Sequence, residues 1–149
     1  MSEQKQGLTQ KKEIKRKTRI VLASGKRKKA IARAIVYPGE GIVRINGRRL
    51  EALEIKYIRG LIEEPLLLIG DLRNTINIKV RVTGGGISGQ AQAARVAIAR
   101  ALVKYFEDKN LHEIFRTYDR HLLIEDFRRK EMKKYGGPGA RARFQKSYR

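Results

Sequence analysis

Three glycines stand between two regular patterns near the middle of the chain. The stretch "VRVTGGGISGQAQAARVAIARAL" carries Gly84, Gly86 and Gly89 between an alternating apolar segment and an alanine-rich one. The spacing is that of a dinucleotide-binding loop, in which backbone N–H groups at a helix start bind phosphate. Such a site also needs a second parallel strand that ends in an acidic residue. Glu107 and Asp108 lie at the right distance after the glycines, but no apolar segment before them could form that second strand.

The sequence also excludes a P-loop, the phosphate-binding loop of many nucleotide-binding proteins. It would need a Lys-Ser or Lys-Thr pair directly after the glycines, and none is present. Two compatible interpretations remain for the loop. The glycines permit a tight turn and close packing of the helix on a sheet, and the N–H groups of the helix start attract a phosphate, including one of RNA.

The remaining reactive residue types form no recognisable active site. His112 and His121 are the only histidines and lack metal-ligand spacing, and Ser88 lacks the second glycine of a nucleophile turn. We expect the acidic pairs Glu63-Glu64 and Glu125-Asp126 to be solvated or paired with arginines. The sequence therefore predicts no enzyme, no metal, no cofactor and no small-molecule substrate.

Charge is concentrated at the two ends of the chain. Of the net charge of +20 over 149 residues, residues 1–29 carry +9, residues 30–127 carry +3 and residues 128–149 carry +8. Segments this basic repel themselves and are expected to stay extended until a polyanion neutralises them. The tail lacks the amphipathic pattern of a membrane-binding helix. Nucleic acid is therefore the predicted partner, and a membrane is not.

Several cations cluster where turns or tail segments should expose them. Aromatic residues Tyr135, Phe144 and Tyr148 are interleaved with the tail cations, so bases could stack while Arg and Lys meet phosphates. The predicted RNA-binding cations are Lys26, Arg27, Lys28, Lys29, Arg48, Arg49, Arg128, Arg129, Lys133, Lys134, Arg141 and Arg143.

Hydrophobic periodicity predicts a mixed α+β sandwich with about four strands backed by helices. Residues 76–82 alternate as in a half-buried strand, and residues 88–105 follow a helical stripe. Residues 30–45 read as a hairpin around "PGEG", and Pro65 should end or kink a helix over 51–63. A shorter helix is expected over 111–119 and a short strand or extended piece over 121–126. We predict a basic arm (1–18), a globular domain (19–127) and a basic tail (128–149).

The cellular location follows from what the sequence lacks. It has no cysteine, no apolar run long enough to span a membrane, and no apolar core of a secretory signal at its amino end. We therefore expect a cytoplasmic protein.

Five motifs together resemble one known family over about residues 20–149. "GKRKKAIARA", "RINGR", "VRVTGGGISGQAQAARVAIARALV", "YDRHLL" and "DFRRKEMKKYGGPGARARFQKSYR" are similar to the ninth protein of the small ribosomal subunit, in its archaeal-like branch. The resemblance implies a non-enzymatic component of the subunit head that contacts rRNA and neighbouring ribosomal proteins. It also implies a four-stranded sheet with a β-α-β unit of the split type and a left-handed crossover, against the usual right-handed rule.

The resemblance also implies specific contacts. Members of this family thread the carboxy-terminal tail through rRNA until its last residues approach P-site tRNA. Carried over, Arg149 would meet a tRNA phosphate beside Tyr148, Ser147 and Lys146, while Arg141 and Arg143 hold the tail in rRNA. The glycine loop, with Gly85, Gly86 and Gln90, would serve packing and rRNA binding.

Two rival interpretations stay open at this stage. One is a basic nucleic-acid-binding protein that acts outside the ribosome. The other is a phosphotransferase that uses the loop from Gly84 to Gly89, because the same fold family includes small-molecule kinases.

Overall fold

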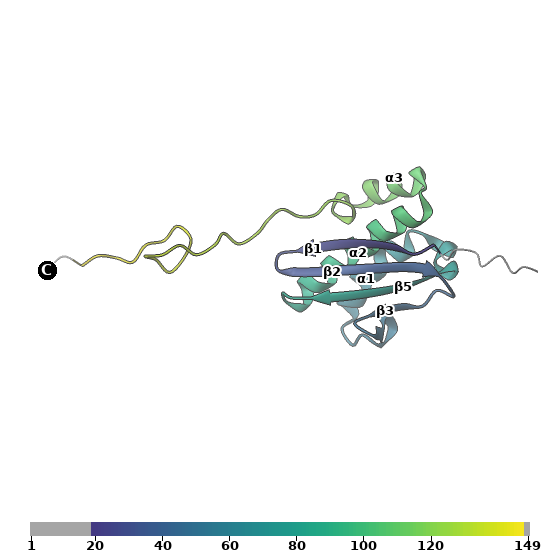
Figure 1. Ribbon diagram of the computed structural model, residues 1–149, viewed down its shortest axis with the longest axis horizontal. Coiled ribbons are helices and arrows are strands. Elements are labelled where there is room, and N and C mark those ends of the chain that lie inside the picture. Colours follow the sequence, from purple (N-terminus) through teal and green to yellow (C-terminus); the bar gives the residue numbers. More distant parts are fainter. Residues whose placement is uncertain (1–18, 148–149) are drawn as a thin grey trace, which may run out of the picture.

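A five-stranded mixed sheet forms the centre of the protein. The computed structural model describes residues 19–147, and its sheet has the order β1-β2-β5-β3-β4 (Figure 1). The strands are β1 (Val21–Arg27), β2 (Ala30–Pro38), β3 (Val43–Ile45), β4 (Arg48–Arg49) and β5 (Ile76–Thr83). The expected α+β class is confirmed, and the strand beyond the expected four is the two-residue β4. The predicted arm over residues 1–18 lies outside the described residues.

The strand pairing corrects the predicted hairpin over residues 30–45. β2 pairs with β1 on one side and with β5 on the other, both antiparallel, while β3 pairs with β5 in parallel. The hairpin is therefore formed by β1 and β2, and its turn is Lys28-Lys29, with Lys28 at φ 54°. The residues "PGEG" instead connect β2 to β3 across the start of β5. There the side chain of Asn77 accepts hydrogen bonds from the backbone N–H groups of Glu40 (3.1 Å) and Ile42 (2.8 Å).

Three α-helices and three short 3-10 turns complete the domain. Their bounds are η1 Leu50–Ala52, α1 Lys56–Leu67, η2 Gly70–Thr75, α2 Ile87–Phe106, α3 Lys109–Tyr118 and η3 Arg120–Leu122. The parallel strands β3 and β5 are joined through α1. This connection is the crossover that the family resemblance implies to be left-handed. The two strands are immediate neighbours, so the β-α-β unit lacks the intervening strand of a split arrangement.

The core lies between one face of the sheet and α2. Alternate residues of β2 (Ala30, Ala32, Ala34, Val36) and of β5 (Ile76, Ile78, Val80, Val82) are buried, as the period of two requires. α2 lies behind β1, β2 and β5 (Figure 1). Its buried alanines let the helix backbone approach the sheet closely. That closeness fixes where the start of α2 stands relative to the β1–β2 turn.

Most helix predictions hold with shifted ends. The helices expected over 88–105 and 111–119 are confirmed as α2 and α3, and Asp108 caps α3 by accepting a hydrogen bond from the Asn110 N–H (2.9 Å). The helix expected over 51–63 begins at Lys56 and continues to Leu67, with Pro65 buried inside it. Of the two effects expected of Pro65, an end or a kink, the first is wrong, because the helix continues for two further residues. Residues 121–126 form no strand, since a 3-10 turn holds the first two.

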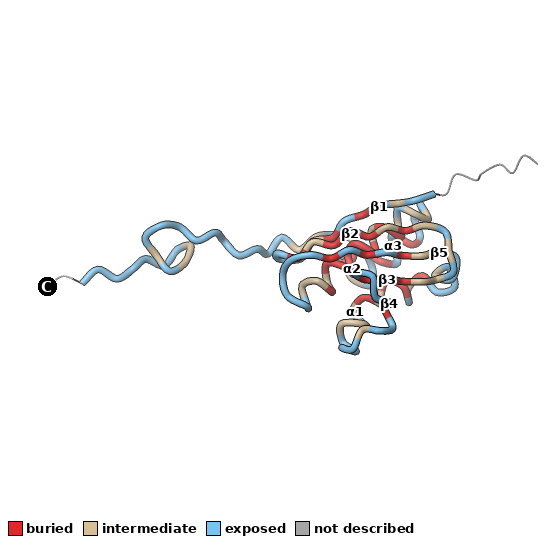
Figure 2. The backbone as a smooth tube through the Cα atoms, turned by 60° about the horizontal axis from the view of Figure 1, so that its bottom comes forward, coloured by how far each residue is buried: buried red, intermediate tan, exposed pale blue. Residues whose placement is uncertain are grey.

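The segment after Phe127 leaves the domain and contains no helix or strand through residue 147. Figures 1 and 2 show it running away from the sheet, almost entirely exposed. It is not uniformly extended, because the Phe144 N–H donates to the Gly136 carbonyl (3.3 Å) and closes a small loop. No helix within residues 19–147 has the length and apolar character needed to span a membrane.

Candidate nucleic-acid interface

The glycine loop between β5 and α2 packs directly against the β1–β2 turn. Gly84 and Gly85 adopt φ of 75° and 67°, which glycine tolerates and other residues rarely adopt. A Cβ on Gly84 would lie 2.7 Å from the Lys29 carbonyl oxygen, and one on Gly85 would lie 2.9 Å from the Ala30 nitrogen. The tight turn expected of the glycines is therefore seen at Gly84 and Gly85, whereas a Cβ on Gly86 would meet nothing within 4 Å. The packing of Gly84 and Gly85 brings the lysines of the β1–β2 turn beside the start of α2.

α2 begins without a side-chain cap. Gly86 is the N-cap, and it leaves open space where a side chain would stand. Gln90 stabilises the turn from inside the helix, since its side chain donates to the Gly84 carbonyl (3.1 Å). The first N–H groups of a helix have no partner within it and carry the positive end of the helix dipole. They therefore favour an anion at this position.

The tail root, residues 126–130 where the tail leaves the domain, is held beside the start of α2. Arg27 donates to the Gln92 side chain (2.7 Å) on α2 and forms an ion pair with Asp126. Asp126 also accepts from the Arg128 backbone N–H (2.8 Å) and pairs with the Arg128 guanidinium (2.9 Å). Arg27 is only 18% exposed, so it serves as the structural link between turn, helix and tail.

The hydrogen bonds at Asp126 set its protonation state. Donation from the Arg128 side chain, followed by donation from its backbone N–H, holds the pKa of Asp126 well below its usual range, and the charges of Arg128 and Arg27 add to this effect. The same contact raises the pKa of Arg128. The carboxylate therefore stays ionised at acidic pH where a free aspartate would be protonated, and it pairs there with Arg27 and Arg128.

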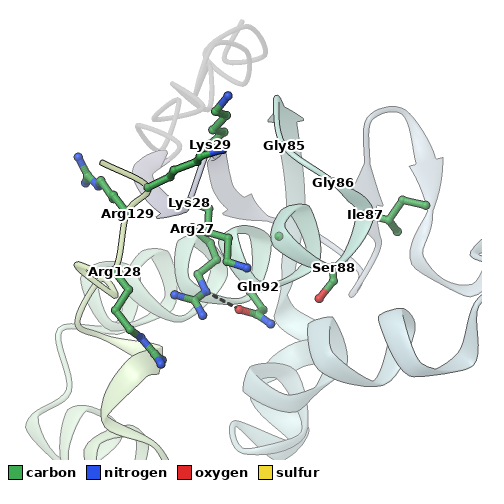
Figure 3. Close-up of a pocket in the computed structure, with 12 residues that line it drawn as sticks. Arg27, Lys28, Lys29, Gly85, Gly86, Ile87, Ser88, Gln92, Arg128 and Arg129 are labelled. Atoms are coloured by element: carbon green, nitrogen blue, oxygen red, sulfur yellow. Dashed lines mark hydrogen bonds between the residues drawn. The ribbon is translucent and has the colours of Figure 1, made fainter. Parts of the chain in front are cut away.

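The β1–β2 turn, the start of α2 and the first residues of the tail line a basic cavity of about 910 Å³ (Figure 3). The Lys28-Lys29 turn, residues 85–89 of the helix start, and residues 128–130 of the tail line it, together with Arg27 and Gln92. Lys28, Lys29 and Lys130 form no ion pair with any acid in residues 19–147. Lysines without an ion pair and the start of α2 therefore line one hollow, which suits a phosphate group or a short run of phosphates.

The structure gathers about half of the predicted RNA-binding residues at this cavity. Arg48 and Gln90 line a neighbouring hollow of about 410 Å³, Lys26 lines a smaller one, and Arg49 lies on β4. Four cations stand on the tail away from the domain: Lys133, Lys134, Arg141 and Arg143.

The tail cations differ in their partners. Lys134 and Arg141 both pair with Glu131 (3.3 and 2.9 Å), and Arg143 donates to the Tyr135 carbonyl (2.9 Å). Lys146 and Ser147 are exposed at the end of the described tail. Tyr148 and Arg149 lie outside the described residues.

The predicted RNA-binding set omitted five lining residues of the main cavity: Ile87, Ser88, Gly89, Gln92 and Lys130. Lys130 continues the run "RRK" that contains Arg128 and Arg129, so the charge run itself could have indicated it. Gln92 becomes significant only through its bond to Arg27, a contact 65 residues apart in the chain. Local sequence carries no signal for such a pairing.

The connection after α2 is not that of a dinucleotide site. α2 is followed by α3, so no second parallel strand brings Glu107 or Asp108 to the loop. Within residues 19–147 no group of His, Cys, Asp and Glu is placed to hold a metal ion. The acid Glu64 is matched by an arginine, as expected, because Arg95 contacts both Glu64 (2.5 Å) and Asp119 (2.8 Å).

Comparison with known proteins places this basic domain and tail among the ribosomal proteins. The chain belongs to the family described as "Ribosomal protein S9/S16", whose profile matches residues 25–149. It is 51% identical over 129 residues to the small ribosomal subunit protein uS9 of Thermoplasma acidophilum, covering 87% of this chain and 100% of that relative.

Two further relatives agree with this assignment. The uS9 protein of Halobacterium salinarum is 53% identical over 127 residues, which cover 85% of this chain and 96% of the relative. That of Desulfurococcus amylolyticus is 50% identical over 133 residues, with 89% and 95% covered. The resemblance seen in the motifs, including its archaeal-like character, is confirmed.

Proposed function

We propose that this chain is a structural, non-catalytic constituent of the small ribosomal subunit and binds rRNA in the head of that subunit. It would act in the cytoplasm within the particle, beside neighbouring ribosomal proteins. Family membership supports this proposal, and the cavity at the start of α2 supplies its physical basis. Lys28, Lys29 and Lys130, which lack ion-pair partners in the described chain, would meet rRNA phosphates there.

The arrangement of the tail supports a second part of the proposal, contact with P-site tRNA. The tail leaves the domain beside the cavity and carries its cations well away from the sheet (Figure 1). Arg141 and Arg143 would bind rRNA along the way, while Lys146, Ser147, Tyr148 and Arg149 would reach a tRNA phosphate. Because residues 136–144 fold into a loop, opening that loop on RNA would lengthen the reach.

Co-sedimentation with small subunits through a high-salt wash tests the ribosomal assignment. A chain integrated into folded rRNA should stay with the particle, whereas electrostatic contacts on the particle surface weaken steeply with salt. A chain that washes off completely would instead favour a basic nucleic-acid-binding protein acting outside the ribosome. Saturable ATP binding by the free chain would favour the phosphotransferase alternative.

A further inference from the structure

The sheet has a second face that no helix within residues 19–147 covers. Figure 1 views this face directly, with α1 and α2 behind the strands. Four cations project from it on three neighbouring strands, and all four are exposed: Arg33, Arg44, Lys79 and Arg81. None of them belongs to the cavity at the start of α2 or to the tail, so the cluster is separate from the interface described above.

The pairing register places these cations side by side. In one row across the sheet, Ser24 of β1 pairs with Arg33, which pairs with Arg81 of β5. In the next row, Lys79 of β5 pairs with Arg44, which pairs with Arg49 of β4. Neither row contains an acidic residue. In antiparallel pairs such as Arg33–Arg81 and Arg44–Arg49, directly opposite residues share a face and have Cβ atoms about 5 Å apart, so both rows place like charges in direct opposition.

Such opposition lowers the stability of the free protein, and nothing in the described chain relieves it. None of the four cations forms an ion pair within residues 19–147. Some other arginines of the domain, by contrast, have acidic partners, as Arg59 has Glu63 and Arg95 has Glu64. An uncompensated cluster on an open face points to an anionic partner outside the chain.

The same face is hollowed, with cations around an apolar floor. A cavity of about 750 Å³ lies over β1, β2 and β5, bounded by the turn at Asn46-Gly47. Leu22, which is 60% exposed, and Ile35 form its floor. The backbone of a nucleic acid strand presents phosphates to cations and sugars to apolar surface, and this lining can meet both.

We propose that the open face of the sheet is a second RNA-binding surface, at which Arg33, Arg44, Lys79 and Arg81 contact the phosphate backbone of an rRNA segment. This segment differs from the one held at the start of α2, so the domain would lie between two parts of the RNA. The inference rests on the proposed binding of small-subunit rRNA.

The test compares salt dependences of binding by full-length chains. The probe is an in vitro transcript of the head domain of small-subunit rRNA. For Arg33→Gln/Arg81→Gln, the slope of log affinity against log salt should become shallower by about 1.4 to 1.8, because each of the two lost phosphate contacts contributes roughly 0.7 to 0.9. The matched control, Arg116→Gln/Arg120→Gln on α3 and η3, loses the same charge from an exposed helical surface and should change the slope much less.

Folding is checked by thermal melting. The double variant should melt at the same temperature as the unaltered chain or higher, because it removes a repulsion between paired strands. If it fails to fold, Arg44→Gln/Lys79→Gln tests the second row, with the same expected slope change.

The outcomes separate this inference from the function on which it rests. If the unaltered chain shows no salt-dependent binding to the transcript, the proposed function fails. If the unaltered chain binds but the variant has an unchanged slope, or one equal to that of the control, the second surface is disproved. An unchanged slope with loss of a neighbouring protein from variant-containing subunits would assign the face to an acidic protein segment instead.

Discussion

Replacing Lys28, Lys29 and Lys130 together with glutamine should weaken RNA binding more than any other change of three charges in residues 19–130. The three residues line one cavity together with the positive end of α2 and have no acidic partner in residues 19–147. If each meets one phosphate, the log-log salt slope should become shallower by about 2 to 3. Arg27 is left in place because it links the turn to α2 and to Asp126.

Filter binding or fluorescence anisotropy at several salt concentrations measures this slope. The matched control is Lys56→Gln/Lys104→Gln/Lys109→Gln, three exposed lysines on α1, α2 and α3. Both triple variants lower the net charge equally, so a change that depended on net charge alone would appear in both. Equal slopes for the two variants would contradict a specific role for the cavity.

Gly25→Ala should destabilise the protein by about 3 kcal/mol, because β1 and α2 touch backbone to backbone at this residue. A Cβ there would lie 2.4 Å from the Ala93 carbonyl oxygen and 2.5 Å from the Ala97 nitrogen. Neither backbone atom can move without separating the helix from the sheet. The separation would also displace the start of α2 from the β1–β2 turn, so weaker RNA binding should accompany the loss of stability.

Gly60→Ala is the matched control for this change. Gly60 lies within α1 and has nothing within 4 Å of an added Cβ, so alanine should stabilise the helix by about 0.5–1 kcal/mol. Urea unfolding followed by circular dichroism measures both variants. A Gly25→Ala protein as stable as the unaltered chain would show that β1 and α2 are not in this close contact.

The parts of the fold that the sequence predicted are those set by local patterns. The alternation of residues 76–82 and the alanine stripe of residues 88–105 each lie within one element, and both were confirmed. The predicted hairpin failed because pairing is decided between elements. β5 enters between β2 and β3 after α1 has intervened, so the turn residues of "PGEG" revealed a chain reversal but not its partner.

Much the same holds for the candidate site. Charge runs indicated Lys28, Lys29, Arg128 and Arg129, since runs are visible in one dimension. That the first two and the last two share a cavity, with Gln92 and the helix start, depends on contacts 65 and 99 residues apart in the chain. The four sheet-face cations are not adjacent in the sequence, since even Lys79 and Arg81 have Val80 between them. Only the strand register assembles all four into a cluster.

We propose that the domain binds rRNA and that the tail contacts P-site tRNA. The most direct test is the rate at which P-site tRNA is released from small subunits. Subunits reconstituted with the full chain are compared with subunits containing a chain that ends at Phe144, at the same salt and magnesium concentrations. We predict equal incorporation of both chains, because the domain supplies most rRNA contacts, and faster tRNA release from the truncated particle. Failure of the truncated chain to enter subunits, or equal release rates from the two particles, would contradict the account.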